Sequence, residues 1–226
     1  MSSWRLLAVM VLANCCAEDV MCGRYGLFQW DESLSGVAGF PAGQEPAWSW
    51  APGAMVLLLH HDKYNQPQIT QARWGLTPSW ATDFSRTPAQ ARAETIATQP
   101  MFRQAFQKRR GVMPANGFYE WRGGMRKQPF WMTVPERIVY FAAIWEPYPV
   151  MGKTWYSCAV VTTAAADQRR PVILSGDALE QWLDPNTPES ELLALLSSST
   201  PELRERPLAT WVNDPLLNTP QCLTPL

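Results

Sequence analysis

The chain has few of the residues that build metal centres. Only two histidines occur among 226 residues, and they are neighbours, His60 and His61. Adjacent histidines argue against a multi-histidine metal site, so we expect no metal. The apolar run before them places both at the end of a strand, in a surface turn. The five cysteines are odd in number and irregularly spaced, which predicts neither a disulfide framework nor a zinc site.

Charged residues are also scarce and unevenly distributed. They make up 17% of the chain, while 46% is hydrophobic, a balance that excludes a disordered polymer. The formal net charge of −1 argues against a uniformly basic nucleic-acid binder. Between Arg73 and Lys127, however, ten basic residues stand against three acidic ones, and the remainder of the chain has nine against 17. This basic middle can form an anion-binding face or, around residues 103–110, a solvated helix.

The first twenty residues do not read as part of the fold. Their apolar run, residues 6–13, is shorter than the roughly 20 residues that a membrane-spanning helix needs. The run resembles the core of a secretory signal, and a lipoprotein signal would use the paired cysteines that follow it. We favour a third interpretation, in which translation starts at Met21. We therefore divide the chain into an N-terminal extension, residues 1–20, and one domain, residues 21–226.

Short apolar runs between frequent turn signals predict a single α+β domain with a β-rich core and flanking helices. Strands are expected where β-branched and aromatic residues gather, at 56–59, 68–74, 112–121, 129–134, 138–145 and 156–163. The Gly-Gly pair within 122–125 predicts a hairpin turn. Helical stretches are expected within 91–108 and at 178–183 and 188–197.

Four short motifs follow one another along the chain. They are Met21-Cys22-Gly23-Arg24-Tyr25, Gln90-Ala91-Arg92-Ala93-Glu94-Thr95, Pro114-Ala115-Asn116-Gly117-Phe118-Tyr119-Glu120-Trp121, and Thr162-Thr163-Ala164-Ala165 with Arg169-Arg170-Pro171-Val172-Ile173-Leu174 after it. With Trp50-Ala51-Pro52-Gly53 and Arg73-Trp74-Gly75-Leu76-Thr77-Pro78-Ser79-Trp80, the ordered set resembles the SRAP family (SOS-response-associated peptidases, or abasic site processing proteins). Each motif alone is weak, but their order is specific and covers residues 21–225. The resemblance implies one SRAP-like domain with a barrel-like β core.

The resemblance implies chemistry on abasic sites in single-stranded DNA, within the DNA damage (SOS) response. An N-terminal Cys22 would condense its α-amine with the sugar aldehyde, and its thiol would close a thiazolidine ring. An internal cysteine has no free amine, and an α-amine, which titrates near about 7.7–8.0, is partly neutral at physiological pH. We therefore expect the active chain to begin at Cys22, after loss of Met21 or self-cleavage by an autopeptidase (hydrolase or lyase-type) activity. No cofactor or membrane is implied, and we expect a cytoplasmic monomer that joins the nucleoid at damage.

The resemblance also assigns site residues. The catalytic set is Cys22, Glu120 as a proton shuttle, and Gln90; the DNA-binding set is Arg24, Arg92, Trp80, Arg169 and Arg170. The residues themselves leave other roles open. Glu120 could be a surface charge on an edge strand, Trp80 a core residue and Cys22 a buried apolar thiol.

Two departures from the family pattern weaken the expected chemistry. Gln90 stands where the family has asparagine, and the extra methylene would displace its amide. The family histidine before the Pro-Val-Ile-Leu strand is absent, since residues 166–168 run directly into Arg169. We expect impaired proton transfer, so the alternative is a catalytically weakened single-stranded DNA-binding paralogue. An exported protein of other function would fit a true signal at 1–20, whereas a general cysteine protease lacks a histidine partner.

Overall fold

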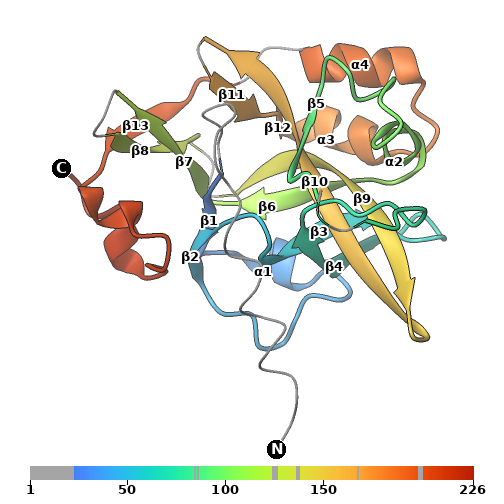
Figure 1. The fold of residues 1–226 in the computed structure, drawn as a ribbon, viewed down its shortest axis with the longest axis horizontal. Coiled ribbons are helices and arrows are strands. Elements are labelled where there is room, and N and C mark those ends of the chain that lie inside the picture. Colours follow the sequence, from blue (N-terminus) through green and yellow to red (C-terminus); the bar gives the residue numbers. More distant parts are fainter. Residues whose placement is uncertain are drawn as a thin grey trace, which may run out of the picture.

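The protein is described by a computed structural model, which covers residues 23–83, 85, 87–123, 127–135, 138–166, 168–197 and 201–226. Two β-sheets and several short helices make up this part of the chain, as Figure 1 shows. The prediction of an α+β fold with a barrel-like β core is confirmed.

Five strands of the larger sheet close into a ring. They are β3 (Met55–His61), β4 (Pro67–Trp74), β6 (Arg110–Ala115), β9 (Val139–Val150) and β10 (Lys153–Ala165). Neighbours pair in the order β10, β4, β3, β6, β9, and β9 pairs again with β10. All these pairings are antiparallel except that of β10 with β4. Since every strand of the ring has two neighbours, the barrel leaves none of these five as an open edge.

Three short strands extend this sheet beyond the ring. β5 (Gln90–Arg92) pairs in parallel with β10, β11 (Gln168–Pro171) pairs antiparallel with the end of β10, and β12 (Ile173–Leu174) pairs with β9. Thr162 of β10 is in register with Arg92 on one side and with Pro171 on the other. The end of β10 therefore brings together two segments that are far apart in the sequence.

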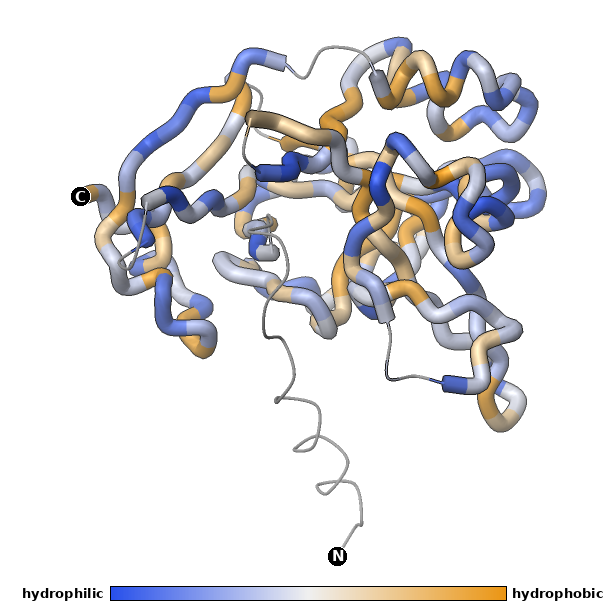
Figure 2. The backbone as a smooth tube through the Cα atoms, turned by 45° about the horizontal axis from the view of Figure 1, so that its top comes forward, coloured by the Kyte–Doolittle hydropathy of each residue, from blue (hydrophilic) through white to orange (hydrophobic). Residues whose placement is uncertain are grey.

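The smaller sheet has the strand order β13-β8-β7-β1-β2 and lies beside the barrel (Figure 1). Its strands are β1 (Tyr25–Leu27), β2 (Ala47–Trp50), β7 (Gly117–Arg122), β8 (Gln128–Thr133) and β13 (Arg204–Pro207). Its aromatic side chains join it to the barrel core, because the rings of Tyr25 and Phe118 lie 5.8 and 5.9 Å from that of Phe141 on β9. The backbone tube in Figure 2 is strongly hydrophilic along β13, which forms one edge of this sheet.

The helices of the described residues are α1 (Glu32–Ser35), α2 (Arg103–Lys108), α3 (Gly176–Leu183), α4 (Glu189–Ser197) and the 3-10 turns η2 (Thr210–Asn213) and η3 (Pro220–Leu223). The helices α2 and α3 pack against the barrel, α4 packs on α3, and the two C-terminal 3-10 turns pack against the smaller sheet (Figure 1). The expected helices at 178–183 and 188–197 correspond to α3 and α4, and the helical part of 91–108 is α2. Among the described residues, no helix has the length and apolar character needed to cross a membrane.

Arg110 belongs to the basic middle of the sequence, yet its side chain is enclosed between barrel and helices. Its guanidinium donates to the carbonyl oxygens of Phe106 and Gln107 at 3.0 and 2.7 Å, and to those of Trp182 and Asp184 at 2.8 and 2.7 Å. These carbonyls stand at the ends of α2 and α3, where no intrahelical donor is available. The expectation of solvated residues at 103–110 is therefore wrong for Arg110, which is 7% exposed.

The strand expected over 112–121 is two strands. Asn116 separates β6 from β7, and its side-chain oxygen accepts from the backbone N–H groups of Phe28 and Gln29 at 2.7 and 2.9 Å. At Gly117 the chain passes so close to β8 that a Cβ would lie 2.5 Å from the carbonyl oxygen of Met132. The interruption therefore moves the chain from the barrel into the smaller sheet.

The histidine pair also differs from expectation. Both residues do end a strand, but His60 is only 5% exposed, so a surface turn is wrong for it. Its Nε2 lies 2.9 Å from the Thr70 hydroxyl, and its ring packs 4.7 Å from that of Trp145. Burial lowers the pKa of His60, which favours the neutral ring.

Candidate functional site

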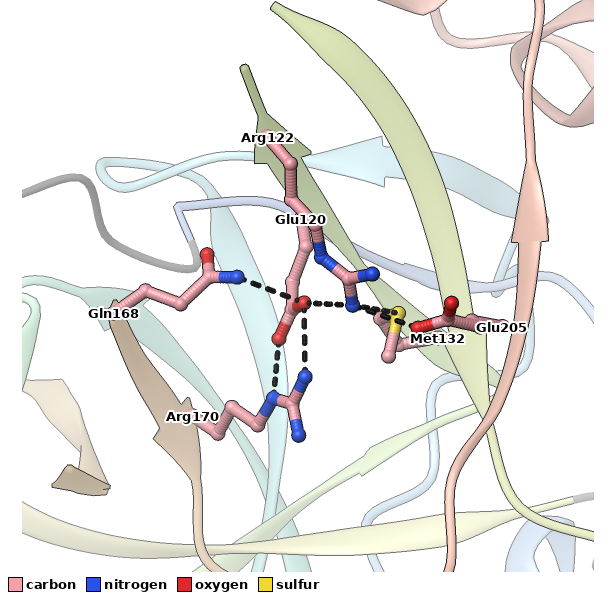
Figure 3. Close-up of polar contacts among 6 residues, drawn as sticks. All are labelled: Glu120, Arg122, Met132, Gln168, Arg170 and Glu205. Carbon is pink, nitrogen blue, oxygen red and sulfur yellow. Dashed lines mark hydrogen bonds and ion pairs between the residues drawn. The ribbon is translucent and has the colours of Figure 1, made fainter. Parts of the chain in front are cut away.

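Glu120 lies on β7 where the smaller sheet faces β11 of the larger one. It is 1% exposed, so the alternative of a surface charge on an edge strand is wrong. Figure 3 shows three side chains directed at its carboxylate. Arg170 donates from Nε at 2.5 Å and from Nη2 at 3.2 Å, Gln168 donates from Nε2 at 3.0 Å, and Arg122 donates from Nη2 at 2.9 Å.

Strand alternation explains why these side chains meet. Residues two apart on a strand point to the same face, so Glu120 and Arg122 share one face of β7. Gln168 and Arg170 share one face of β11 for the same reason, and β11 is fixed by its antiparallel pairing with the end of β10. Each sheet therefore contributes a pair of polar side chains to one buried point.

Arg122 continues the cluster towards the C-terminal strand. Its Nη2 also donates to Glu205 of β13 at 2.8 Å, and its guanidinium lies 4.6 Å from the ring centroid of Phe130. The hydrogen bond from Arg122 lowers the pKa of Glu205, and that bond together with Glu120 raises the pKa of Arg122. Two guanidinium groups thus balance two carboxylates, a pairing that a buried carboxylate requires.

Arg169 points away from this cluster and forms a second one. Its Nη2 donates to Glu94 at 2.6 Å and to the carbonyl oxygen of Thr162 at 2.7 Å, and its Nε donates to the Thr162 hydroxyl at 3.1 Å. Burial opposes ionisation of Glu94, but the hydrogen bond and positive charge of Arg169, together with backbone hydrogen bonds, outweigh it, and the pKa of Glu94 is lowered. The predicted phosphate contacts of Arg169 and Arg170 stay predictions, and in the structure both side chains bind carboxylates.

Arg24 lies on the opposite face of the smaller sheet from Glu120. Its Nε donates to the Ser49 hydroxyl at 2.7 Å and its Nη1 to the carbonyl oxygen of Val212 at 2.5 Å. Its guanidinium lies 5.8 and 5.6 Å from the rings of Tyr119 and Trp121, and burial lowers its pKa. The structure therefore does not bring Arg24 into the Glu120 cluster, and its predicted DNA contact is untested.

The remaining predicted site residues in the described part of the chain are Gln90 of the catalytic set and Arg92 and Trp80 of the DNA-binding set. On β5, Gln90 is half-buried opposite Val160, and Arg92 is exposed opposite Thr162. Trp80 is 57% exposed, so its alternative role as a core residue is wrong. The segment that carries Trp80 contacts the first half of β10, where the Thr77 N–H donates to the Ser157 hydroxyl at 2.8 Å.

The described chain starts beside Glu120. β1 and β7 pair antiparallel with Tyr25 opposite Phe118, and the Tyr119 N–H donates to the Arg24 carbonyl at 3.0 Å. Extrapolated by one residue beyond this hydrogen bond, the register places Gly23 opposite Glu120. Cys22, which precedes it, lies outside the described residues, as does Met21.

A comparison with family models decides the family. Residues 21–215 match the model of the SOS response associated peptidase (SRAP) family. The chain belongs to the SRAP family.

Relatives from bacteria and from a vertebrate match this chain at similar sequence identity. The chain is 30% identical over 222 residues to the abasic site processing protein YoaM of Bacillus subtilis, a match that covers 90% of this chain and 97% of the relative. It is 31% identical over 180 residues to YedK of Escherichia coli, covering 72% and 79% of the two chains. A match to HMCES of Gallus gallus is also 31% identical and covers 70% of this chain and 57% of that protein.

A solved structure supports the SRAP fold. A crystal structure of a protein from Bacteroides thetaiotaomicron superposes with a TM-score of 0.78 at 20% identity, covering 91% of this chain and 100% of that one. At this identity the likeness concerns the fold alone.

Sequence reasoning missed three members of the Glu120 cluster in this SRAP chain: Arg122, Gln168 and Glu205. Arg122 could have been found, because the period of a strand places it on the face of Glu120. Gln168 lies next to Arg169, a predicted DNA-binding residue, but it is not part of any of the family motifs. Glu205 is 83 residues from its partner Arg122, and no local pattern connects them.

Proposed function

We propose that this SRAP protein processes abasic sites in single-stranded DNA by forming a covalent thiazolidine crosslink through Cys22. Relatives across 90% of its length are named abasic site processing proteins, which supports the reaction class. The observation that carries the proposal is the position of Glu120. A buried carboxylate lies two residues beyond Phe118, the partner of Tyr25, and Tyr25 follows Cys22 by three residues, so the pairing of β1 with β7 directs the chain end towards Glu120.

The proposed reaction balances without a cofactor. The Cys22 α-amine adds to the aldehyde carbon of the open sugar, and loss of one water gives an imine. The thiol sulfur then adds to the imine carbon while the thiol proton passes to nitrogen, which closes the ring. Glu120 accepts the proton released by the amine and returns it to the departing hydroxyl, as a positioned carboxylate can.

The reaction requires a free N-terminus at Cys22. We propose that the active chain begins there, after initiation at Met21 and loss of that methionine, or after self-cleavage before Cys22. Residues 1–20 then form no part of the active protein. Intact-mass measurement of the protein purified from its native host tests this directly, and an N-terminus at Met1 or Ser2 would overturn it.

DNA binding in the proposal uses the end of β10. Arg92 is exposed beside it, and Trp80 offers an exposed ring for stacking on a base. Arg24, Arg169 and Arg170 complete the proposed phosphate contacts, with Gln90 next to the sugar. We place this activity in the DNA damage response, with the protein acting as a monomer.

A denaturing gel tests the proposal. Protein that begins at Cys22 is incubated with a single-stranded oligonucleotide carrying one abasic site, and a band of slower mobility is expected. Cys22→Ala should abolish the band, whereas Cys222→Ala should keep it. An oligonucleotide with a tetrahydrofuran in place of the sugar has no aldehyde and should give no band. A missing band with the parent protein, or a band that persists in Cys22→Ala, would refute the crosslink.

A second function is favoured by the Gln168 contact. Its amide donates to Glu120 at 3.0 Å, and an amide cannot exchange a proton at physiological pH as an imidazole can. The protein would then be a single-stranded DNA-binding paralogue with weak catalysis. Binding in a mobility-shift assay under native conditions, without a covalent band, would identify this function.

A further inference from the structure

One side chain connects the proposed proton-transfer residue to a distant strand. Arg122 Nη2 donates to the Glu120 carboxylate at 2.9 Å and to the Glu205 carboxylate at 2.8 Å (Figure 3). We propose that Glu205 on β13, acting through Arg122, is a positioning residue that controls when Glu120 takes up its proton. This inference rests on the proposed function, because it concerns the role of Glu120 in the crosslinking reaction.

The two carboxylates bind the same nitrogen in different surroundings: Arg122 Nη2 carries two N–H groups and donates to both at once. The Glu120 side chain has no exposed surface, whereas that of Glu205 is 50% exposed. Water can replace the contact of Glu205 with Arg122, but it cannot replace the contact of Glu120. The positive charge of Arg122 is therefore shared between a buried carboxylate and an exposed one, and the exposed one can be removed without leaving a buried charge unpaired.

The other described neighbours of Glu120 add one cation and no further acidic group. The sharing of Arg122 with Glu205 is therefore the contact that a substitution can change. β11 supplies the cation Arg170 and the neutral Gln168, and β8 supplies Met132, whose sulfur lies 3.8 Å from Arg122 Nη2. Before β1, Gly23 is the residue that the extrapolated register places opposite Glu120, and it carries no charge. Among the described contacts, Glu205 is the acidic group that shares a guanidinium with Glu120.

Removing Glu205 and removing Arg122 should shift the pH–rate profile of crosslinking in opposite directions. Glu205→Gln leaves Arg122 to Glu120, which favours the carboxylate, so the acid limb of the pH–rate profile should move to lower pH. Arg122→Met removes a cation beside a buried carboxylate, so the acid limb should move to higher pH by about one unit. Arg122→Lys keeps the charge but loses the two-sided geometry of the guanidinium, and it should restore part of the shift.

The test measures crosslinking rates from pH 3 to 9 for the parent protein and these variants; ionisation of the Cys22 α-amine, near about 7.7–8.0, is common to all of them, so only a shift between variants reports on Glu120. Glu202→Gln is the matched control, since Glu202 is an exposed carboxylate three residues earlier and its loss changes net charge equally. Opposite shifts for Glu205→Gln and Arg122→Met, with no shift for Glu202→Gln, support the proposal. No shift for Glu205→Gln, or a loss of rate without any change in the profile, overturns it and leaves Glu205 a purely structural residue.

A spectroscopic measurement keeps the inference separate from the proposed function. The NMR signal of the Arg170 Nε–H, which donates to Glu120 at 2.5 Å, reports the charge of that carboxylate without DNA. The pH at which this signal changes should fall in Glu205→Gln and rise in Arg122→Met. If the parent protein forms no crosslink, the proposed function fails, and this signal still decides the inference. An unchanged midpoint in Glu205→Gln would refute it.

Discussion

At the scale of single residues, Gln168 is the neighbour that limits what Glu120 can do. Its amide holds the carboxylate in place but adds no group that titrates near neutral pH. The arginines beside it are likewise permanently protonated. Within this cluster, the groups that can accept a proton are the carboxylates of Glu120 and Glu205, and of these two Glu120 is the buried one.

An imidazole at position 168 should assist proton transfer by Glu120. We predict that Gln168→His raises the rate of crosslinking by about tenfold or more, since a positioned acid–base group commonly contributes a larger factor. The rate is measured as the growth of the covalent band under single-turnover conditions. Gln168→Leu, which removes the amide without adding a titrating group, serves as the control and should not exceed the parent. Equal rates for the histidine and leucine variants would contradict the prediction.

At the scale of elements, the break between β6 and β7 fixes the direction in which Glu120 points. Asn116 accepts two backbone hydrogen bonds there, and Gly117 passes β8 at a distance that leaves no room for a side chain. From Gly117 onward the strand belongs to the smaller sheet. The inward face of β7, which carries Phe118 and Glu120, is set by this crossing.

A methyl group at the crossing should destabilise the protein. We predict that Gly117→Ala lowers the free energy of unfolding by about 1–3 kcal/mol, because its Cβ would lie 2.5 Å from the Met132 carbonyl oxygen and from the Trp131 ring. Urea unfolding followed by tryptophan fluorescence measures the change. Gly43→Ala is the matched control, since its new methyl group would have no atom within 4 Å and its stability should be close to the parent's. Equal stabilities for both variants would argue against the steric account.

At the scale of the whole molecule, a single guanidinium joins the helices to the barrel. Arg110 starts β6 and reaches the ends of α2 and α3 through four backbone carbonyls. At the C-terminal ends of these two helices, the guanidinium supplies donors that the helix backbone lacks.

Loss of Arg110 should loosen the helices before the barrel. We predict that Arg110→Met lowers the free energy of unfolding by about 3 kcal/mol, since carbonyls bound to a charged donor become unsatisfied. Hydrogen exchange should speed up most in α2 and α3. Arg103→Met, at an exposed position on α2, is the control and should leave exchange nearly unchanged. Uniformly faster exchange in every strand would mean that the contact does not act on the helices in particular.

The order of the motifs along the chain predicted the family and the fold. The features that the sequence did not predict depend on contacts between residues far apart in the chain. The ordered motifs from Met21 to Leu174 led to the SRAP fold, and local periodicity located β3, β4 and β8. The break at Asn116 depends on a contact with a segment 87 and 88 residues away, so residues 112–121 alone still predicted one strand. Glu120 was found from its motif, but Glu205 was not, because only the folded sheet brings β13 beside β8 and β7.

The order in which the Glu120 cluster assembles has a consequence during synthesis. Its members come from β7, β11 and β13, and the last of these ends at Pro207. A ribosome releases the chain N-terminus first, so the proposed Cys22 nucleophile emerges long before its proton-transfer group is complete. If translation starts at Met21, as proposed, a growing chain would carry the aminothiol before the carboxylate cluster has formed. Full reactivity towards a lesion is reserved for the finished polypeptide.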